Sequence, residues 1–293
     1  MGAISREACP RSHRLMADAA ATLAGAGVEN PRLDAELLMA EAAGVSRAAL
    51  LANLATADDC AEKRYAELIR RRAAREPIAY ILGRREFYSI EFEVGPAVLI
   101  PRPETETIVE AAIEFIASRQ DCRVLDLGTG SGAIALAIAA NAPAARVVAT
   151  DFSVAALEVA SRNARRLGLG ARIELRRADC FDAIGGPSLG RFDLIVSNPP
   201  YIREADLVVL QPEIRCYEPR IALAGGADGL DFHRRITRDA KGYLVPGGVL
   251  MVETGAGQAP AAAALFRIAG LAKVRMLNDL GGNPRAIASV PDL

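Results

Sequence analysis

The spacing of apolar residues changes along the chain and indicates two kinds of structure. From about residue 12 to residue 74, Ala and Leu recur at helical spacing, which predicts a small bundle of helices. Ser46 indicates the start of one short helix, and Asp59 with Glu62 three residues later resembles a capping box that begins the next. The N-terminal part of the chain is therefore predicted to be helical.

The apolar period becomes two between residues 86 and 100, which is typical of strands. The alternating residues surround Gly95-Pro96, so we predict a β-hairpin with its turn at this dipeptide. We expect the hairpin to join two domains. The expected boundaries are a helical domain over residues 1–84, a hairpin linker over 85–101 and a second domain over 102–293.

Strand and helix patterns alternate after Cys122. Strands are predicted at 123–127, 146–150, 172–176, 192–197, 248–253 and 273–277, and helices at 132–140, 154–167, 229–242 and 258–269. Such alternation predicts an α/β fold with a parallel sheet that is covered by helices on both faces. Ligands of these folds bind at the carboxyl ends of the strands, so the residues that follow each strand are the candidates for chemistry.

The composition narrows the possible classes of protein. Hydrophobic residues make up 51% and charged residues 24% of the chain, as in globular proteins. The five cysteines form no C-x-x-C pair and there are only two histidines, so we expect no metal site. Charged residues interrupt the first twenty positions, which argues against a signal peptide. We expect a cytoplasmic monomer that neither enters a membrane nor binds nucleic acid stably.

The charge is unevenly distributed despite a net value of −1. Residues 60–86 contain eight Lys or Arg against four Glu. A run of this kind is usually a solvated helix face, and the alternative is a docking surface for an acidic or RNA-associated partner.

A glycine-rich segment follows the first strand of the alternating region. Asp126-Leu-Gly128-Thr129-Gly130-Ser131-Gly132 ends that strand and opens a helix, where glycines allow a ligand to approach the backbone. Asp151 ends the next strand and is placed to accept both ribose hydroxyls of a bound nucleoside. The same glycines also satisfy the dinucleotide-binding pattern, so this segment alone leaves a nicotinamide cofactor open.

Ser197-Asn198-Pro199-Pro200-Tyr201 follows the fourth strand and resolves this ambiguity. The two prolines prevent continuation of the strand and force a stiff turn. This turn fixes the Asn198 carboxamide and the carbonyls of Asn198 and Pro199, with Tyr201 as an aromatic wall, an arrangement of acceptors that suits a planar NH2 group. A plain strand-ending turn is the alternative. A dehydrogenase has no use for this motif, whereas in S-adenosylmethionine enzymes this position faces the reactive methyl group.

Other candidate residues lie near these motifs. Asp179, after the third strand, is either a hydrogen-bond partner for the adenine amino group or a helix cap, and Cys180 and Phe181 would lie beside the adenine ring. His233 lies in a predicted helix, where we expect a surface or half-buried structural role.

These motifs together resemble the HemK/PrmC family of protein-(glutamine-N5) methyltransferases. The likeness runs from about residue 75 to the C-terminus. It rests on Arg75-Glu-Pro-Ile-Ala-Tyr-Ile-Leu-Gly83, Glu86-Phe87, Leu99-Ile-Pro-Arg-Pro-Glu-Thr-Glu106, Asp126 to Gly132, Asn198 to Tyr201, Tyr217-Glu-Pro219, Gly225-Gly-Ala-Asp-Gly-Leu230 and Gly281-Gly-Asn-Pro-Arg285. The chain departs from the family at Cys180, where many relatives carry an aromatic residue.

The resemblance implies a class I S-adenosyl-L-methionine-dependent methyltransferase, a Rossmann-like fold with a seven-stranded sheet whose last strand is antiparallel. Its helical N-terminal domain would bind the substrate. The substrate implied is the glutamine of the Gly-Gly-Gln loop in class-1 peptide chain release factors. Asn198 and Pro199 would bind the amide hydrogens, and Pro200 and Tyr201 would pack beside the glutamine side chain. Gly128 to Gly132, Asp151, Asp179, Cys180, Phe181 and Asn198 would bind the cofactor.

Other functions stay open at this point. The sister family modifies a ribosomal-protein glutamine, but its sequence differs from this chain at Pro101–Glu106. Amino-methyltransferases of nucleic acids also use Asn-Pro-Pro-Tyr, with a flipped base against the aromatic ring. A third alternative is a cofactor-binding module without activity, whose basic helix contacts the translation machinery.

Overall fold

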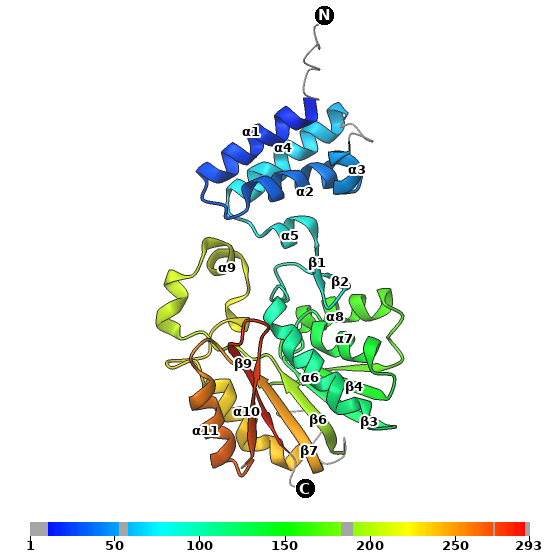
Figure 1. Ribbon diagram of the computed structural model, residues 1–293, viewed down its shortest axis with the longest axis vertical. Helices are drawn as coiled ribbons and strands as arrows, with labels where there is room; N and C mark the ends of the chain where they lie inside the picture. Colours follow the sequence, from blue (N-terminus) through cyan, green and yellow to red (C-terminus); the bar gives the residue numbers. More distant parts are fainter. Residues whose placement is uncertain (1–10, 53–57, 183–189, 272, 291–293) are drawn as a thin grey trace, which may run out of the picture. The chain divides into compact units, whose positions relative to one another are not determined.

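The computed structural model describes residues 11–52, 58–182, 190–271 and 273–290. The chain divides into two compact units (Figure 1). One consists of the residues up to Gly83 together with Pro212–Tyr217, and the other of Arg84–Gln211 together with Glu218–Leu293. The short segment 212–217 therefore belongs to the helical unit, although the residues on both sides of it in the sequence belong to the other unit.

The first unit is helical, as predicted. Its described helices are α1 (Arg11–Gly25), α2 (Pro31–Ala43), α3 (Arg47–Leu51), α4 (Asp59–Ala73), α5 (Ile78–Leu82) and α9 (Pro212–Tyr217). Leu23, Leu38 and Met39 are fully buried at its centre. The expected capping box at Asp59 is wrong by one residue, because Asp58 is the N-cap and accepts a hydrogen bond from the backbone N–H of Ala61.

Buried ion pairs hold α9 within the first unit. Arg72 on α4 is buried and donates to Asp34 on α2 at 2.7 Å and to Glu213 on α9 at 3.0 Å. Arg75 donates to the same Glu213 carboxylate at 2.6 Å. The neighbouring Arg71 pairs with Glu76. Much of the positive charge of the basic segment is therefore compensated within the unit.

The second unit begins with a hairpin of β1 (Arg84–Phe87) and β2 (Ile90–Glu93). Phe87 pairs with Ile90, so the turn consists of Tyr88 and Ser89, which have φ values of 52° and 58°. The predicted turn at Gly95-Pro96 is wrong. A two-residue turn with both φ values positive matches the twist of paired strands and usually contains Asn or Gly. Because Tyr88 and Ser89 occupy these positions here, the sequence does not indicate the turn.

A sheet of seven described strands forms the centre of the second unit, in the order β5-β4-β3-β6-β7-β9-β8. These strands are β3 (Cys122–Leu127), β4 (Ala145–Asp151), β5 (Ile173–Arg177), β6 (Phe192–Ser197), β7 (Leu244–Glu253), β8 (Val274–Asn278) and β9 (Pro284–Ser289). Strand β9 runs antiparallel to both its neighbours. The seven strands and the antiparallel partner implied by the family resemblance are confirmed, while apolar spacing alone missed β9.

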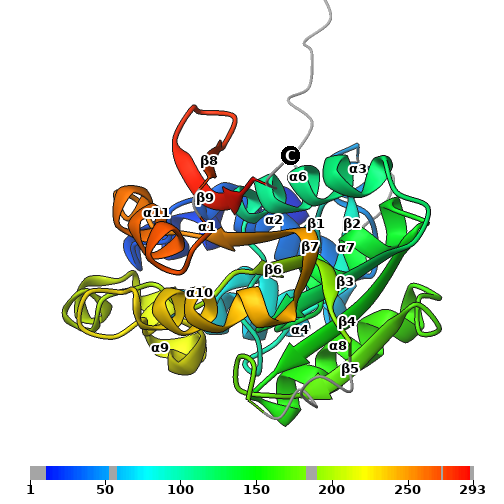
Figure 2. The same ribbon diagram turned by 90° about the horizontal axis from the view of Figure 1, so that it is seen from below.

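Helices cover both faces of this sheet (Figure 2). Helices α6 (Glu106–Ala117), α7 (Ala133–Asn141) and α8 (Val154–Arg166) lie on one face, and α10 (Asp231–Tyr243) and α11 (Ala259–Ile268) on the other. Successive strand residues point to opposite faces, so Val124 packs under the first layer and Leu125 under the second. Short 3-10 turns lie at Pro103–Thr105, Glu204–Val209 and Arg220–Ala222. None of the described helices is long and apolar enough to span a bilayer.

The strand register brings the predicted site residues to one edge of the sheet. Leu127 at the end of β3 is paired with Thr150 of β4 on one side and with Ser197 of β6 on the other. Asp151 is paired with Arg177 at the end of β5. The segments that follow these four strands are therefore neighbours in space.

Candidate active site

The glycine-rich loop between β3 and α7 has the conformation that its sequence predicts. Gly128, Gly130 and Gly132 have φ values of 73°, 56° and 83°, in the left-handed region that favours glycine. A β-carbon at Gly128 or Gly130 would meet no described atom within 4 Å, whereas one at Gly132 would lie 2.9 Å from the Leu136 side chain. The first two glycines thus face open space, and the third allows α7 to begin close to Ala160 of α8.

Asp151 joins this loop to the end of β4. Its carboxylate accepts hydrogen bonds from the backbone N–H of Gly130 and of Ser153, both at 2.9 Å. Burial raises the pKa of Asp151, although these backbone N–H groups oppose the rise. A carboxylate has about four acceptor positions, so Asp151 still has capacity for ligand hydroxyls.

Asp126 lies under the loop and is fully buried. The Thr129 hydroxyl donates to its Oδ2 atom at 2.6 Å, while no described residue donates to Oδ1. Burial raises the pKa of Asp126 to about 7. This carboxyl holds Thr129 and so supports the shape of the glycine loop from below.

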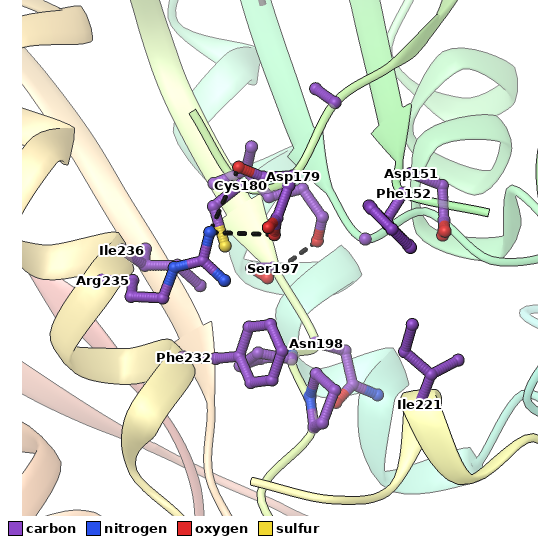
Figure 3. Close-up of a pocket in the computed structure, with 15 residues that line it drawn as sticks. Asp151, Phe152, Asp179, Cys180, Ser197, Asn198, Ile221, Phe232, Arg235 and Ile236 are labelled. Carbon is purple, nitrogen blue, oxygen red and sulfur yellow. Dashed lines mark hydrogen bonds and ion pairs between the residues drawn. The ribbon is translucent and has the colours of Figure 1, made fainter. Parts of the chain in front are cut away.

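A cavity of about 260 Å³ opens beside Asp151 and reaches the turn after β6 (Figure 3). Its apolar wall comes from three distant segments, with Phe152 after β4, Ile221 in a 3-10 turn and Phe232 on α10. Asn198 lies between Ile221 and Phe232 in this view. The apolar wall with a few polar groups at its edges is typical of a small-molecule site.

A second cavity also adjoins the glycine loop. Its lining includes Val98, Thr105, Thr129, Gly130 and Asn198. Both cavities are lined by Gly128, Asp151, Asn198 and Ile221. Asn198 therefore lies where the two cavities meet.

The segment after β5 supplies one end of the first cavity. Asp179 and Cys180 line it, and the Asp179 carboxylate forms an ion pair with Arg235 of α10 at 2.9 Å (Figure 3). No described helix begins at Asp179, so the alternative of a helix cap is not observed among the described residues. Phe181 is 5% exposed and stacks on Tyr243 with ring centres 4.6 Å apart. The structure thus places Phe181 in the core beneath the cavity and not among its lining residues.

The turn after β6 is held from both sides. The Ser197 hydroxyl donates to the carbonyl of Leu127 at 2.8 Å, which fixes the end of β6 to β3. Asn198 Nδ2 donates to Thr105 Oγ1 at 3.1 Å. No described residue donates to Asn198 Oδ1. Asn198 Oδ1 is the oxygen predicted to accept a substrate N–H, and it has no hydrogen-bond partner among the described residues.

Tyr201 lies behind this turn. Its hydroxyl donates to Glu253 Oε1 at 3.3 Å, and its carbonyl accepts from Gln258 Nε2 at 2.9 Å. Tyr201 lines neither of the two cavities, so the structure gives its ring a supporting position. Burial raises the pKa of its hydroxyl, which therefore stays protonated near neutral pH.

Glu253 and His233 form a polar cluster that the sequence did not indicate as part of the site. Glu253 at the end of β7 is 2% exposed, and His233 is fully buried with Nε2 at 2.8 Å from the Glu253 carbonyl. The expected surface or half-buried place for His233 is therefore wrong. Burial lowers the pKa of His233, which keeps its ring neutral.

Two motifs of the family resemblance meet at the second cavity. Arg102 forms an ion pair with Glu218, and the backbone N–H of Ile100 donates to Glu218 Oε2 at 3.2 Å. Glu218 is 6% exposed. The Pro101–Glu106 motif and Glu218 are thus partners in one corner of the second unit, and Arg102 has a structural role there.

The arrangement of the strands also agrees with known methyltransferase structures. A methyltransferase from Pyrococcus furiosus is similar to 79% of this chain and to 100% of its own chain, with a TM-score of 0.51 and 20% identity. At this identity the likeness concerns the fold alone.

Comparison of sequences identifies the family. Residues 14–83 match the model of the PrmC N-terminal domain, and residues 108–214 match that of the methyltransferase small domain. A release factor glutamine methyltransferase from Geobacter sulfurreducens is 47% identical over 90% of this chain and 91% of its own. The Bordetella pertussis protein of the same name is 48% identical over 87% of this chain and 93% of its own. The chain belongs to the release factor glutamine methyltransferase family.

Proposed function

We propose that this protein transfers the methyl group of S-adenosyl-L-methionine to the side-chain nitrogen of the glutamine in the Gly-Gly-Gln loop of class-1 peptide chain release factors. The position of Asn198 carries the proposal. It lies where two cavities meet, and its Oδ1 atom accepts no hydrogen bond from a described residue. An acceptor at this place suits an amide NH2 group.

The residues at the sheet edge fit the cofactor. Gly128 and Gly130 present backbone without side chains toward open space, and Asp151 beside them retains acceptor capacity for the ribose hydroxyls. Asp179 and Cys180 would hold the adenine side, with Phe152 and Phe232 as apolar walls. The bound cofactor supplies an electrophilic methyl group. Thr129, Ser131 and Gly132 complete the loop around it.

Asn198 and Pro199 would act on the glutamine. A carboxamide nitrogen is a weak nucleophile because its lone pair is delocalised into the carbonyl. When the Asn198 side-chain oxygen and the Pro199 carbonyl each accept one N–H, the nitrogen is held with its lone pair directed at the methyl group. Orientation of two reactants supplies about 7–11 kcal/mol, whereas one polar contact to a reacting group supplies about 3–4 kcal/mol. Geometry therefore contributes more than proton transfer.

The protein substrate follows from the family and from one segment of the chain. The Pro101–Glu106 segment differs from the sister family that modifies a ribosomal protein, and in this structure it forms a corner with Glu218 beside the second cavity. A release factor is therefore favoured over a ribosomal protein as the substrate. The helical N-terminal unit would contact the rest of the release factor.

Mass spectrometry tests the proposal. The wild-type protein is incubated with methyl donor and a class-1 release factor, and the loop peptide is analysed for one added methyl group on its glutamine. A release factor with Gln→Glu at that position is the control. We expect modification of the first and none of the second. Methylation of a ribosomal-protein glutamine, DNA or RNA with the release factor unmodified would contradict the proposed substrate.

A further inference from the structure

One glutamine side chain joins three segments around the turn after β6. Gln258 lies at the start of α11, and its Nε2 atom donates to the Tyr201 carbonyl at 2.9 Å and to the Asp228 carbonyl at 3.4 Å. Its Oε1 atom accepts from the backbone N–H of Gly255 at 2.9 Å. The carboxamide therefore connects the end of the Asn-Pro-Pro-Tyr turn with the glycine segment 225–230 and with the residues that follow β7.

Glycines in two of these segments make room for Gln258. A β-carbon at Gly229 would overlap with both Gln258 Nε2 and the Tyr201 carbonyl. A β-carbon at Gly255 would lie only 2.7 Å from Gln258 Oε1. The backbone N–H of Gln258 also donates to the Gly255 carbonyl at 3.1 Å. The backbone of both segments therefore fits closely around this one side chain.

The chemistry of a carboxamide matches all three contacts. The NH2 group of Gln258 has two hydrogens for the two carbonyls, and its oxygen accepts the N–H group. Glutamate and methionine have side chains of about the same length. An ionised carboxylate could still accept the N–H group but has no hydrogen for the carbonyls, and a thioether offers no donor and only a weak acceptor. Neither residue could therefore replace the hydrogen bond to Tyr201.

The hydrogen bond from Gln258 acts on the backbone at the end of the turn. The start of the turn is fixed to β3 by the Ser197 hydroxyl, which donates at 2.8 Å. At the other end, Gln258 holds the Tyr201 carbonyl. The two prolines between these ends restrict the backbone, so a displacement of the Tyr201 carbonyl is transmitted to Asn198 and Pro199.

We propose that Gln258 is a positioning residue, which holds the Tyr201 carbonyl and thereby places the acceptors of Asn198 and Pro199 for methyl transfer. The role of these two acceptors rests on the proposed function. Gln258 lines neither of the two cavities, so its effect on the reaction passes through the turn. Substitution of Gln258 should therefore lower kcat while the affinity for the methyl donor stays nearly the same.

The first experiment observes the turn in the free protein by hydrogen exchange. The backbone N–H groups of Ile202 and Glu204 donate to carbonyls of the segment 223–226, so their exchange reports how firmly the residues after Tyr201 are held. We expect about tenfold faster exchange of both amides in Gln258→Glu, because the hydrogen bond to the turn is lost. Unchanged exchange would overturn the proposal, even if the enzyme methylates release factor. No release factor is present here, so failure of the proposed substrate leaves this readout intact.

The second experiment compares the turnover of two variants on release factor. Gln258→Glu keeps the acceptor for the Gly255 N–H group but places an oxygen without hydrogen against the Tyr201 carbonyl. Gln258→Met removes all three contacts without such an oxygen. If the Tyr201 carbonyl is the decisive contact, kcat should fall about a hundredfold in Gln258→Glu and about tenfold in Gln258→Met. The Kd for S-adenosyl-L-homocysteine should change little in both.

The order of the two variants decides which contact matters. A wild-type kcat in Gln258→Glu, or a greater loss in Gln258→Met, would overturn the proposal, because the contact to Gly255 would then be the important one. A Kd for S-adenosyl-L-homocysteine that rises as much as kcat falls would also overturn it. If the wild type leaves release factor unmodified, the proposed function is wrong, and the exchange measurement alone decides whether Gln258 holds the turn.

Gln120→Glu is the matched control. Gln120 is exposed and precedes β3, at the opposite edge of the sheet from the carboxyl ends of the strands. The substitution introduces the same charge and leaves the contacts of Gln258 intact. We expect the wild-type kcat, Kd for S-adenosyl-L-homocysteine and hydrogen exchange. If Gln120→Glu reproduced the effects of Gln258→Glu, the added negative charge would explain both and the positioning role would be wrong.

Discussion

Gly225 packs directly against the backbone of Tyr201. A β-carbon at position 225 would lie 2.7 Å from the Tyr201 α-carbon and 2.8 Å from the Pro200 carbonyl. Backbone hydrogen bonds between Ile202 and the strand-like segment at Leu223 and Gly225 fix the two segments in this register. The glycine motif at 225–230 thus supports the Asn-Pro-Pro-Tyr turn from behind.

We predict that Gly225→Ala displaces this turn and lowers turnover about a hundredfold, because a shift of about 1 Å in reacting groups has that effect. Affinity for S-adenosyl-L-homocysteine, measured by calorimetry, should change much less. Gly242→Ala is the control, since a β-carbon there meets no described atom within 4 Å and Ala favours helix. Wild-type turnover in Gly225→Ala would show that the close contact is unimportant.

Asp151→Ala should weaken cofactor binding before it affects the chemical step. The variant removes the proposed ribose acceptor and the hydrogen bonds to Gly130 and Ser153. We expect a higher Kd for S-adenosyl-L-homocysteine in calorimetric titration, with a turnover closer to the wild type when donor is saturating. An unchanged Kd would exclude Asp151 from the cofactor site.

The stability of the protein should fall as pH rises toward 7. Burial raises the pKa of Asp126 and of Glu253 to about 7, so the folded state keeps two protons that the unfolded chain releases above its ordinary carboxyl pKa. Each group lowers the free energy of unfolding by up to about 1.4 kcal/mol per pH unit between these limits. Urea unfolding of Glu253→Gln at several pH values should show a shallower decrease than the wild type. Identical slopes would mean that Glu253 titrates normally.

The first unit should depend on its buried ion pairs. Arg72→Met leaves Asp34 buried without its partner and leaves Glu213 paired with Arg75 alone, which should lower the free energy of unfolding by about 3–5 kcal/mol. Arg70→Met is the control, because Arg70 and Glu67 form an exposed pair and exposed pairs contribute little to stability. Equal losses in urea unfolding of the two variants would contradict the structural assignment.

The sequence predicted those parts of the site that are encoded locally. The glycine loop and Asp151 each follow a strand directly, so their place at the sheet edge follows from the alternating pattern. The two prolines after Asn198 likewise define a turn without reference to the rest of the chain. In the structure, all of these residues are brought together as expected.

Other features depend on contacts between distant segments and could not be read from local patterns. Phe232 and Arg235 reach the first cavity from α10, and only the folded topology brings this helix to the end of β5. Glu253 ends a strand like many other residues, and its hydrogen bond to Tyr201 has no sequence signature. Segment 212–217 belongs to the helical unit through the ion pairs of Glu213. Its partners, Arg72 and Arg75, precede it by 141 and 138 residues in the sequence.

The rate of methyl transfer to the loop glutamine by Asn198→Ala, with saturating donor and release factor, is the most direct test of the role given to the turn after β6. We predict a rate about a hundredfold or more below the wild type, since one preorganised contact to the reacting group is lost. The Kd for S-adenosyl-L-homocysteine should stay nearly the same. A variant that methylates the glutamine at the wild-type rate would contradict the assignment of Asn198 as the acceptor for the substrate amide.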